Sequence, residues 1–245
     1  MTTTAMPLTD MGNYERAKSG YANMHISWRQ ALGEAWCSPA GMDLHQALAQ
    51  ADLDASSGVG PDVFPPRPLR LRAFGLPVND VRVVIVGQDP YHTPGVADGL
   101  AFSSGKRGKI PASLRNILKE IRDSTGSDSV CADGSLAPWE KQGVLLLNTA
   151  LTVFSGSAGS MGSWGWQDIT SAAISHLSET RAGVVFMLWG QAAQAKADLI
   201  DPSRHFVLTA AHPSPFSARK GFFGCDHFVL TNEIFRQLGQ PPIRW

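Results

Sequence analysis

The sequence predicts a single α/β domain with a central, mostly parallel sheet of four strands and helices on both faces. Four short apolar runs lack the apolar/polar alternation of half-exposed strands, which is typical of strands buried on both faces in a parallel sheet. Amphipathic stretches with helical spacing lie between and after these runs, and strands that alternate with helices indicate a layered α/β fold. A length of 245 residues with 43% hydrophobic residues suits one large domain with a packed core.

The four apolar runs are the predicted strands. They cover residues 81–86, 144–147, 184–189 and 206–208. The longest run, 184–189, has the length of a strand, whereas a membrane-spanning helix needs roughly 20 apolar residues. We therefore expect no membrane span.

Apolar stripes predict three helices. Their members are Leu114, Ile117, Leu118 and Ile121 in the first, Ile169, Ala173 and Leu177 in the second, and Ile234, Phe235 and Leu238 in the third. Ser113 precedes the first stripe, and serine is a preferred N-cap because its hydroxyl accepts a hydrogen bond from the first turn.

The remaining segments connect these elements. Residues 1–22 are expected to form a flexible N-terminal arm, and residues 23–245 the folded domain. The Gly/Pro-rich stretch 56–68 is typical of a connection within the domain, and the Gly/Ser-rich stretch 155–165 is typical of a flexible loop.

Charge and cysteine content exclude several classes. The chain has 21 Lys and Arg residues and 21 Asp and Glu residues, so its formal net charge is zero. It is therefore not a polycation that binds nucleic acid by bulk charge. Local basic patches at 106–109 and 219–220 remain available for such binding. The three cysteines, Cys37, Cys131 and Cys225, are far apart and form no disulfide framework or zinc motif. Residues 1–10 lack the features of a signal peptide, so we expect a cytoplasmic protein.

Polar residues follow each predicted strand. They lie in the segment 87–92 (GQDPYH), at Asn148, at 190–191 (GQ) and in the segment 212–217 (HPSPFS). In an open parallel sheet, ligands bind outside the carboxyl ends of the strands, so these segments should converge on one crevice. Together they supply a carboxylate, an amide, imidazoles and aromatic faces, a set that suits a planar, polar, uncharged ligand attached to an anionic group.

These segments resemble the motifs of family 1 uracil-DNA glycosylases. The segment 87–92 with 99–103 resembles the family's water-activating segment, and 143–148 (GVLLLN) resembles its uracil-reading strand. The segments 212–217 and 221–228 resemble its minor-groove insertion loop and the support of that loop. The resemblance spans about residues 26–245, with the motifs in the family's order. It implies that residues 23–245 are the catalytic domain of a monofunctional glycosylase that hydrolyses the uracil–deoxyribose bond, leaving an abasic site in base excision repair.

The resemblance implies two catalytic residues. Asp89 would orient a water molecule and offset the positive charge that develops on the sugar, although alone it is typical of a turn residue. His212 would donate a hydrogen bond to uracil O2 as the base departs, although a histidine there could also cap a loop.

It also implies a uracil-binding set. Asn148 would pair with N3–H and O4 of uracil, Phe102 would stack on the base, and Tyr91 would lie against C5 and exclude the methyl group of thymine. Gln88 would contribute backbone groups. A flipped amide at Asn148 could read cytosine equally well, so neighbours must hold its orientation, and the sequence does not identify them. Alone, the aromatic residues could belong to the core and Asn148 could be structural.

The resemblance further implies contacts to DNA. The candidate phosphate-binding residues are His92, Ser113, Gly190, Gln191 and Ser214. Phe216 would be the wedge that fills the space left by the extruded nucleotide.

Four positions depart from the family pattern. Phe216 stands where leucine is usual, Gln191 where serine is common, Met161 where many members have histidine, and Lys220 where arginine is usual. Phe216 and Gln191 put the wedge and one phosphate contact in question, but none of the four removes a group needed for bond cleavage.

Two other classes of function remain open. One is a member of the family that binds DNA or uracil without turnover. The other is an unrelated nucleotide hydrolase, but the sequence lacks the phosphate-binding GxxxxGK[ST] loop that would indicate one. No metal or cofactor is expected, since His25, His45, His176 and His205 lack ligand spacing, and Cys225 with His227 is two ligands short of a zinc site. The expected partners are single- and double-stranded DNA containing uracil and a DNA-mimic protein inhibitor, and the expected state is a monomer.

Overall fold

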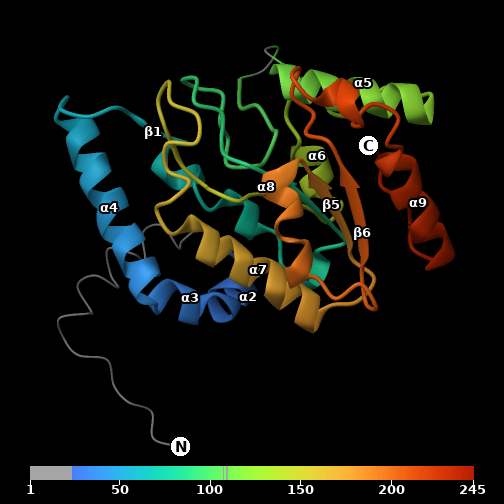
Figure 1. Cartoon of the computed structure of the whole chain (residues 1–245), viewed down its shortest axis with the longest axis horizontal. Coiled ribbons are helices and arrows are strands. Elements are labelled where there is room, and N and C mark those ends of the chain that lie inside the picture. Colours follow the sequence, from blue (N-terminus) through green and yellow to red (C-terminus); the bar gives the residue numbers. More distant parts are fainter. Residues whose placement is uncertain (1–23, 107, 109) are drawn as a thin grey trace, which may run out of the picture.

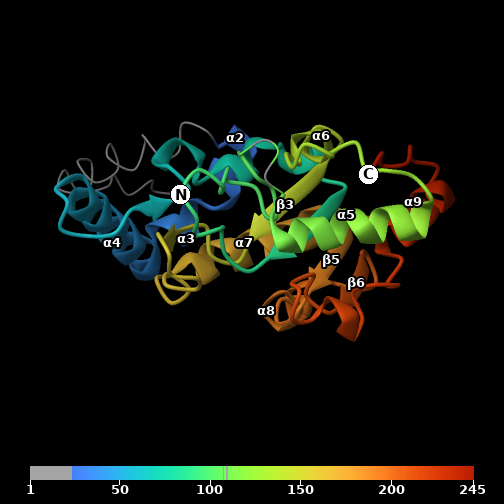
Figure 2. The same cartoon turned by 90° about the horizontal axis from the view of Figure 1, so that it is seen from above.

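The computed structural model describes residues 24–106, 108 and 110–245. The predicted N-terminal arm, residues 1–22, lies outside this part of the chain, as do Arg107 and Lys109 of the predicted basic patch. The described residues form a four-stranded parallel sheet flanked by helices, as the apolar runs predicted (Figures 1 and 2). None of the described helices combines the length and apolar character that crossing a bilayer requires.

The strands of the central sheet run in the order β3-β2-β5-β6. Their bounds are Val83–Gly87 for β2, Val144–Asn148 for β3, Val185–Trp189 for β5 and Phe206–Ala210 for β6. Each neighbouring pair is parallel, and the register places Gly87 beside Asn148 and Trp189 beside Ala210. The polar residues that follow the strands therefore meet at the same edge of the sheet.

Strand β6 departs from the prediction. Strands β2, β3 and β5 are buried along their whole length, as their continuous apolar runs predicted. By contrast, Phe206 and Thr209 of β6 are exposed. The expectation that all four strands are buried on both faces is wrong for β6. Both β3 and β6 lie at edges of the sheet, but α6 packs against β3, whereas β5 is the main neighbour of β6.

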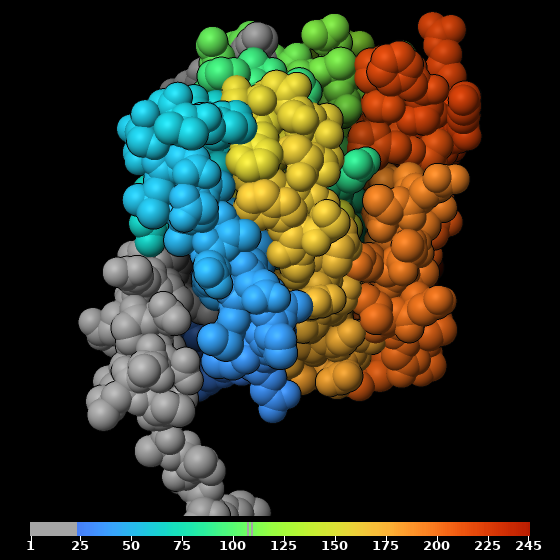
Figure 3. Space-filling view, turned by 60° about the vertical axis from the view of Figure 1, so that its left-hand side comes forward, coloured from blue at the N-terminus to red at the C-terminus, as the bar shows by residue number. Residues whose placement is uncertain are grey.

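The flanking helices pack in two groups. Their bounds are Ile26–Ala31 (α2), Gly33–Cys37 (α3), Pro39–Ser56 (α4), Ala112–Thr125 (α5), Ala137–Glu140 (α6), Trp166–Thr180 (α7), Gln191–Gln194 (α8) and His227–Gln237 (α9). Helices α2, α3 and α4 pack against α7, whereas α5 packs against α9. Figure 3 shows α4 lying along the segment that leads into α7.

The predicted stripes match the first two helices and fail at one residue of the third. Leu114, Ile117 and Ile121 of α5 are buried, as are the stripe residues of α7. Leu238 lies beyond the last turn of α9 and is 43% exposed, so its assignment to the third stripe is wrong.

The prediction of Ser113 as an N-cap is also wrong. Helix α5 begins at Ala112, and Pro111 occupies the N-cap position without a side-chain hydrogen bond. Proline fits there because the backbone before a helix is extended and its fixed φ is compatible with that conformation. Ser113 therefore lies within the first turn of the helix.

A second, two-stranded sheet was not expected from the sequence. Strand β1 (Val63–Phe64), within the Gly/Pro-rich connection, pairs antiparallel with β4 (Val153–Phe154). Each strand is too short for its side-chain pattern to be recognised. The pairing joins the connection to the chain that follows β3.

Candidate active site

A cavity of about 150 Å³ opens at the carboxyl ends of β2 and β3. A cavity of about 150 Å³ can hold a six-membered ring such as benzene. Its lining consists of Gln88, Asp89, Pro90, Tyr91, His92, Ala97, Gly99, Leu100, Phe102, Ser103, Ser113, Asn148, Leu151 and His212. The structure thus brings together the carboxylate at 89, the amide at 148 and the imidazole at 212. Gly190, Gln191, Ser214 and Phe216 of the predicted site lie outside this lining.

Asn148 reaches the cavity because its neighbour in the sheet is a glycine. A Cβ atom added at Gly87 would lie 2.2 Å from Asn148 Oδ1 and 3.3 Å from Cε2 of Phe102. A side chain at position 87 would therefore occupy the place of the amide. Among the described residues, no group forms a hydrogen bond with the Asn148 amide, which leaves its donor and acceptor for a ligand in the cavity.

Asp89 is held by the predicted Gly/Ser-rich loop, residues 155–165. The backbone N–H of Gly159 donates to Oδ2 of Asp89 at 2.6 Å. A charge-assisted hydrogen bond of this kind is short and fixes the position of the carboxylate. The other oxygen, Oδ1, has no protein partner in the described part of the chain, so it is available to water or substrate.

His212 is placed by a glycine and by its own loop. A Cβ atom at Gly190, whose φ is +85°, would lie 2.8 Å from Cβ of His212, so glycine allows this close approach. The N–H of Ser214 donates to Nδ1 of His212 at 3.0 Å. Since Nδ1 accepts, the proton of the neutral ring lies on Nε2, which makes Nε2 a donor. Burial lowers the pKa of His212, and the nearby Asp89 partly opposes this shift, so the neutral ring is favoured.

Phe102 forms an aromatic wall with an unusual backbone. Its φ is +63°, a left-handed conformation that bulky residues rarely adopt. The ring packs on Trp189 at 5.5 Å and on His212 at 5.7 Å between centroids. Tyr91 donates from its hydroxyl to the Phe102 carbonyl at 3.0 Å. Burial, followed by the charge of Asp98, raises the pKa of Tyr91 and keeps it a phenol.

The loop after β6 leaves Phe216 at the surface. Its side chain is 89% exposed, an unusual position for a large apolar group in a folded protein. Ser214 and Ser217 share a hydroxyl hydrogen bond of 2.8 Å, and Ser217 also donates to the His212 carbonyl at 2.8 Å. From α5, Asn116 donates to the Pro213 carbonyl at 2.8 Å. The loop is therefore tied down on both sides of Phe216.

The other predicted DNA contacts lie around this region. Gln191 is exposed at the start of α8, and Ser113 reaches the cavity from the first turn of α5. The carbonyl of His92 accepts from Gly156 N–H at 2.9 Å. Lys220 is exposed near the end of the loop, whereas Met161 is fully buried in the core, where a charged or polar ring would be costly.

Several cavity residues were not singled out from the sequence. These are Pro90, Ala97, Gly99, Leu100, Ser103 and Leu151. Most lie within or beside the segments that carry the motif residues, so proximity in the sequence was the signal that could have identified them. Among the described residues, no cluster of three or more His, Cys, Asp or Glu side chains forms a potential metal site.

The chain is similar in sequence to known proteins. The family model described as the uracil DNA glycosylase superfamily matches residues 74–236. A uracil-DNA glycosylase of Porphyromonas gingivalis is 53% identical over 184 residues, which cover 75% of this chain and 83% of that relative. One of Escherichia coli is 46% identical over 221 residues, 90% of this chain and 94% of the relative.

Solved structures show the same fold. The crystal structure of mimivirus uracil-DNA glycosylase has a TM-score of 0.83 at 22% identity and covers 100% of this chain and 95% of that chain. A mimivirus UNG variant in complex with UGI has a TM-score of 0.82 at 25% identity and covers 91% of this chain and 89% of that chain.

Proposed function

This chain belongs to the uracil-DNA glycosylase superfamily, and we propose that the cavity at the ends of β2 and β3 is where it removes uracil. The protein is a DNA glycosylase that hydrolyses the bond between uracil and deoxyribose, the first step of base excision repair. One observation carries the assignment of the site: Asp89, Asn148 and His212 line the same ring-sized cavity.

The proposed recognition of uracil rests on complementarity. Uracil presents N3–H as a donor beside O4 as an acceptor, and the amide of Asn148 supplies the matching acceptor and donor. Phe102 stacks on the face of the base, and Gln88 contributes backbone groups at the entrance. Tyr91 excludes thymine by steric contact with its methyl group, and its hydrogen bond to the Phe102 carbonyl supports a fixed position of the ring.

The proposed chemistry places opposite charges on the two sides of the breaking bond. As the C1′–N1 bond breaks, its electrons pass to the base and negative charge develops on uracil O2, where Nε2–H of His212 donates a hydrogen bond. The sugar acquires oxocarbenium character, which the carboxylate of Asp89 stabilises while it orients the attacking water. The water oxygen bonds to C1′, and the proton that the water loses balances the charge of the departing uracil anion. A neutral His212 with Nε2–H as donor, supported by the Ser214 hydrogen bond, suits this role.

The proposed binding of DNA involves the rim of the cavity. His92, Ser113, Gly190, Gln191 and Ser214 would contact phosphates by serine hydroxyls and backbone groups, so that uracil in single- or double-stranded DNA reaches the cavity by extrusion of the nucleotide. The exposed Phe216 would fill the gap in the duplex as an apolar wedge.

A DNA-mimic protein inhibitor would occupy the face that binds DNA. The enzyme would act as a monomer in the cytoplasm, where the chromosome lies in bacteria such as those of its Porphyromonas gingivalis and Escherichia coli relatives.

An oligonucleotide assay tests the activity. The protein is incubated with end-labelled DNA carrying a single uracil, in the presence of EDTA, and alkali then cleaves the abasic site. We expect scission at uracil and none at thymine or cytosine in matched oligonucleotides. Binding of the DNA without scission at any enzyme concentration would instead indicate a binding protein.

A variant tests the proposed thymine exclusion. Tyr91→Ala should release thymine slowly, because it opens space for the methyl group, while it still releases uracil. If thymine stays wholly excluded, another group sets the limit and Tyr91 loses this role.

A further inference from the structure

Phe102 holds its ring in the cavity wall from a backbone conformation that it would not adopt by itself. Its φ of +63° lies in the region that favours glycine. Bulky residues remain there only where surrounding contacts enforce the conformation, and such positions are often found at ligand sites. The contacts that hold residues 98–104 therefore decide where the ring lies.

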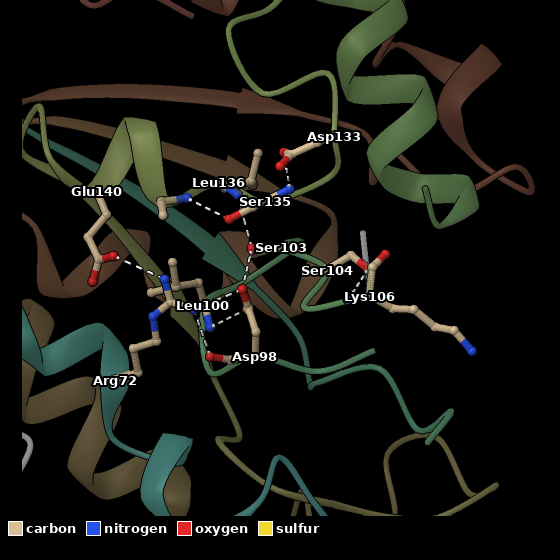
Figure 4. A network of polar contacts seen from close by, with 11 residues as sticks. Arg72, Asp98, Leu100, Ser103, Ser104, Lys106, Asp133, Ser135, Leu136 and Glu140 are labelled. Carbon is tan, nitrogen blue, oxygen red and sulfur yellow. Dashed lines mark hydrogen bonds and ion pairs between the residues drawn. The ribbon is translucent and has the colours of Figure 1, made fainter. Parts of the chain in front are cut away.

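A buried carboxylate organises this turn from behind. The Asp98 side chain accepts hydrogen bonds from the Ser103 hydroxyl at 2.7 Å and from the Leu100 N–H at 3.2 Å, so it binds residues on both sides of Phe102 (Figure 4). The Ser103 hydroxyl in turn accepts from the Leu136 N–H at 3.0 Å. Asp98 is 5% exposed and Ser103 is fully buried, so water cannot readily replace these bonds.

Arg72 completes the network on the side away from the cavity. Its Nη1 lies 2.8 Å from Oδ2 of Asp98 and also donates to the Asp98 carbonyl at 3.1 Å, and its Nη2 contacts Glu140 at 3.3 Å (Figure 4). A buried carboxylate without such a partner would be strongly destabilising. The chain also passes close to Arg72 at Gly99, whose φ is +91° and whose added Cβ would lie 2.8 Å from Cβ of Arg72.

Asp98 itself does not line the cavity. It faces a separate surface groove together with Arg72 and Ser104, whereas Ser103 and Phe102 line the cavity. Asp98 therefore does not contact a substrate in the cavity directly, and its hydrogen bonds reach the cavity wall through Leu100 and Ser103.

We propose that Asp98, charged and paired with Arg72, is a positioning residue that sets the place of the Phe102 ring and so the affinity of the site for uracil. The inference rests on the proposed function of the cavity as the uracil site. A stacking wall contacts the base both before and during bond cleavage, so its displacement weakens substrate and transition state alike. Loss of the Asp98 charge therefore raises KM and leaves kcat nearly unchanged.

Asp98→Asn is the direct test because it keeps the volume of the side chain. An amide at 98 removes the charge that pairs with Arg72. Its NH₂ group faces either Arg72 and Ser103, which both contact Oδ2, or the Leu100 N–H, which contacts Oδ1. We expect KM to rise by about 10-fold, with kcat within about 2-fold of the wild type, which is the signature of lost uniform binding. Inhibition by free uracil should weaken by the same factor.

The matched control is Asp52→Asn. Asp52 of α4 pairs with Arg70 at 2.8 Å in a comparable partly buried contact, and neither residue lines the cavity. This control should lower the melting temperature while KM and uracil inhibition stay at wild-type values. A similar rise of KM in both variants would refute a specific role for Asp98.

A double-mutant cycle with Phe102→Ala separates positioning from general damage. Asp98→Asn should raise KM when Phe102 is present, but it should cause no further rise of KM in the Phe102→Ala background. An additive rise, an unchanged KM, or a loss confined to kcat would each overturn the inference. If Asp98→Asn fails to fold, Ser103→Ala, which removes the hydroxyl link and retains the ion pair, should give the same non-additive KM effect.

The same data distinguish failure of this inference from failure of the proposed function. Wild-type kinetics in Phe102→Ala would contradict the role of the ring and thus the proposed site. A clear KM effect of Phe102→Ala, with wild-type kinetics in Asp98→Asn, would overturn only the positioning role of Asp98.

Discussion

A methyl group added at Gly87 should disable the active site while the sheet remains intact. In Gly87→Ala the new Cβ atom would lie 2.2 Å from Oδ1 of Asn148, whereas ordinary contacts begin at about 3.4 Å. The amide of Asn148 must therefore move by more than about 1 Å, and a misplacement of about 1 Å can lower a rate by roughly 100-fold. We expect kcat/KM for uracil release to fall by about 100-fold, or about 2.7 kcal/mol of transition-state stabilisation.

The fold should tolerate this substitution better than the chemistry does. The next contacts of the added atom, with Cβ of Ala101 at 3.2 Å and with Cε2 of Phe102 at 3.3 Å, are tight but require only small adjustments. Replacement of glycine by alanine also reduces the conformational freedom of the unfolded chain, which offsets part of this cost. The melting temperature, followed by circular dichroism, should stay within a few degrees of the wild type.

The assay compares Gly87→Ala with two other variants. Gly33→Ala is the control, since a Cβ at Gly33 meets nothing within 4 Å, and it should keep wild-type kcat/KM. In an Asn148→Ala background the added methyl group has room, so Gly87→Ala should cause little further loss. A folded Gly87→Ala enzyme with wild-type kcat/KM would refute the reasoning, and an additive loss in the double variant would place the damage elsewhere.

The remaining predictions concern the chemistry and the loop that carries it. Asp89→Asn should slow single-turnover release of uracil by about 100- to 1,000-fold while the affinity for DNA is retained; unchanged turnover would remove the carboxylate from the reaction. Burial lowers the pKa of His212, so its NMR titration midpoint should lie below 6.5, and kcat/KM should fall only as the pH drops through that lower value and the ring takes up a proton. A midpoint at or above 6.5 would contradict the neutral donor. Phe216→Ala should impair release from duplexes more than from single strands, and equal losses would count against a wedge. Asn116→Ala removes the hydrogen bond to the Pro213 carbonyl. It should lower kcat by about 10-fold, because the loop that carries His212 is displaced. A wild-type kcat would show that this hydrogen bond is not needed to position the loop.

The local pattern of apolar residues was sufficient to predict the buried strands at the centre of the fold. Strands β2, β3 and β5 are surrounded by other elements, so their side chains are apolar on both faces and the pattern is visible in the sequence. Strand β6 has a similar apolar run, but like β3 it lies at an edge of the sheet, and the exposure of an edge strand depends on which other elements cover it. The pairing of β1 with β4 joins residues about 90 positions apart and leaves no local signal.

The identity of the site residues was also open to prediction, because short motifs carry them. The protonation and the orientation of these side chains could not be predicted from the motifs. The proton on Nε2 of His212 follows from the Ser214 N–H on Nδ1, and the position of Asp89 follows from Gly159, which is 70 residues away in the chain. A motif names the residue types that a reaction needs, but hydrogen bonds between distant segments orient them.

The sequence by itself thus determined the family, the parallel sheet and the residue types at its edge, because apolar runs and contiguous motifs are local properties. Only the tertiary structure decided that Gly87 and Gly190 admit Asn148 and His212 to the cavity, and that Asp98 and Arg72 hold Phe102 in a left-handed conformation. These features depend on close approach between segments that are remote in the chain, and such distances exist only after the chain has folded.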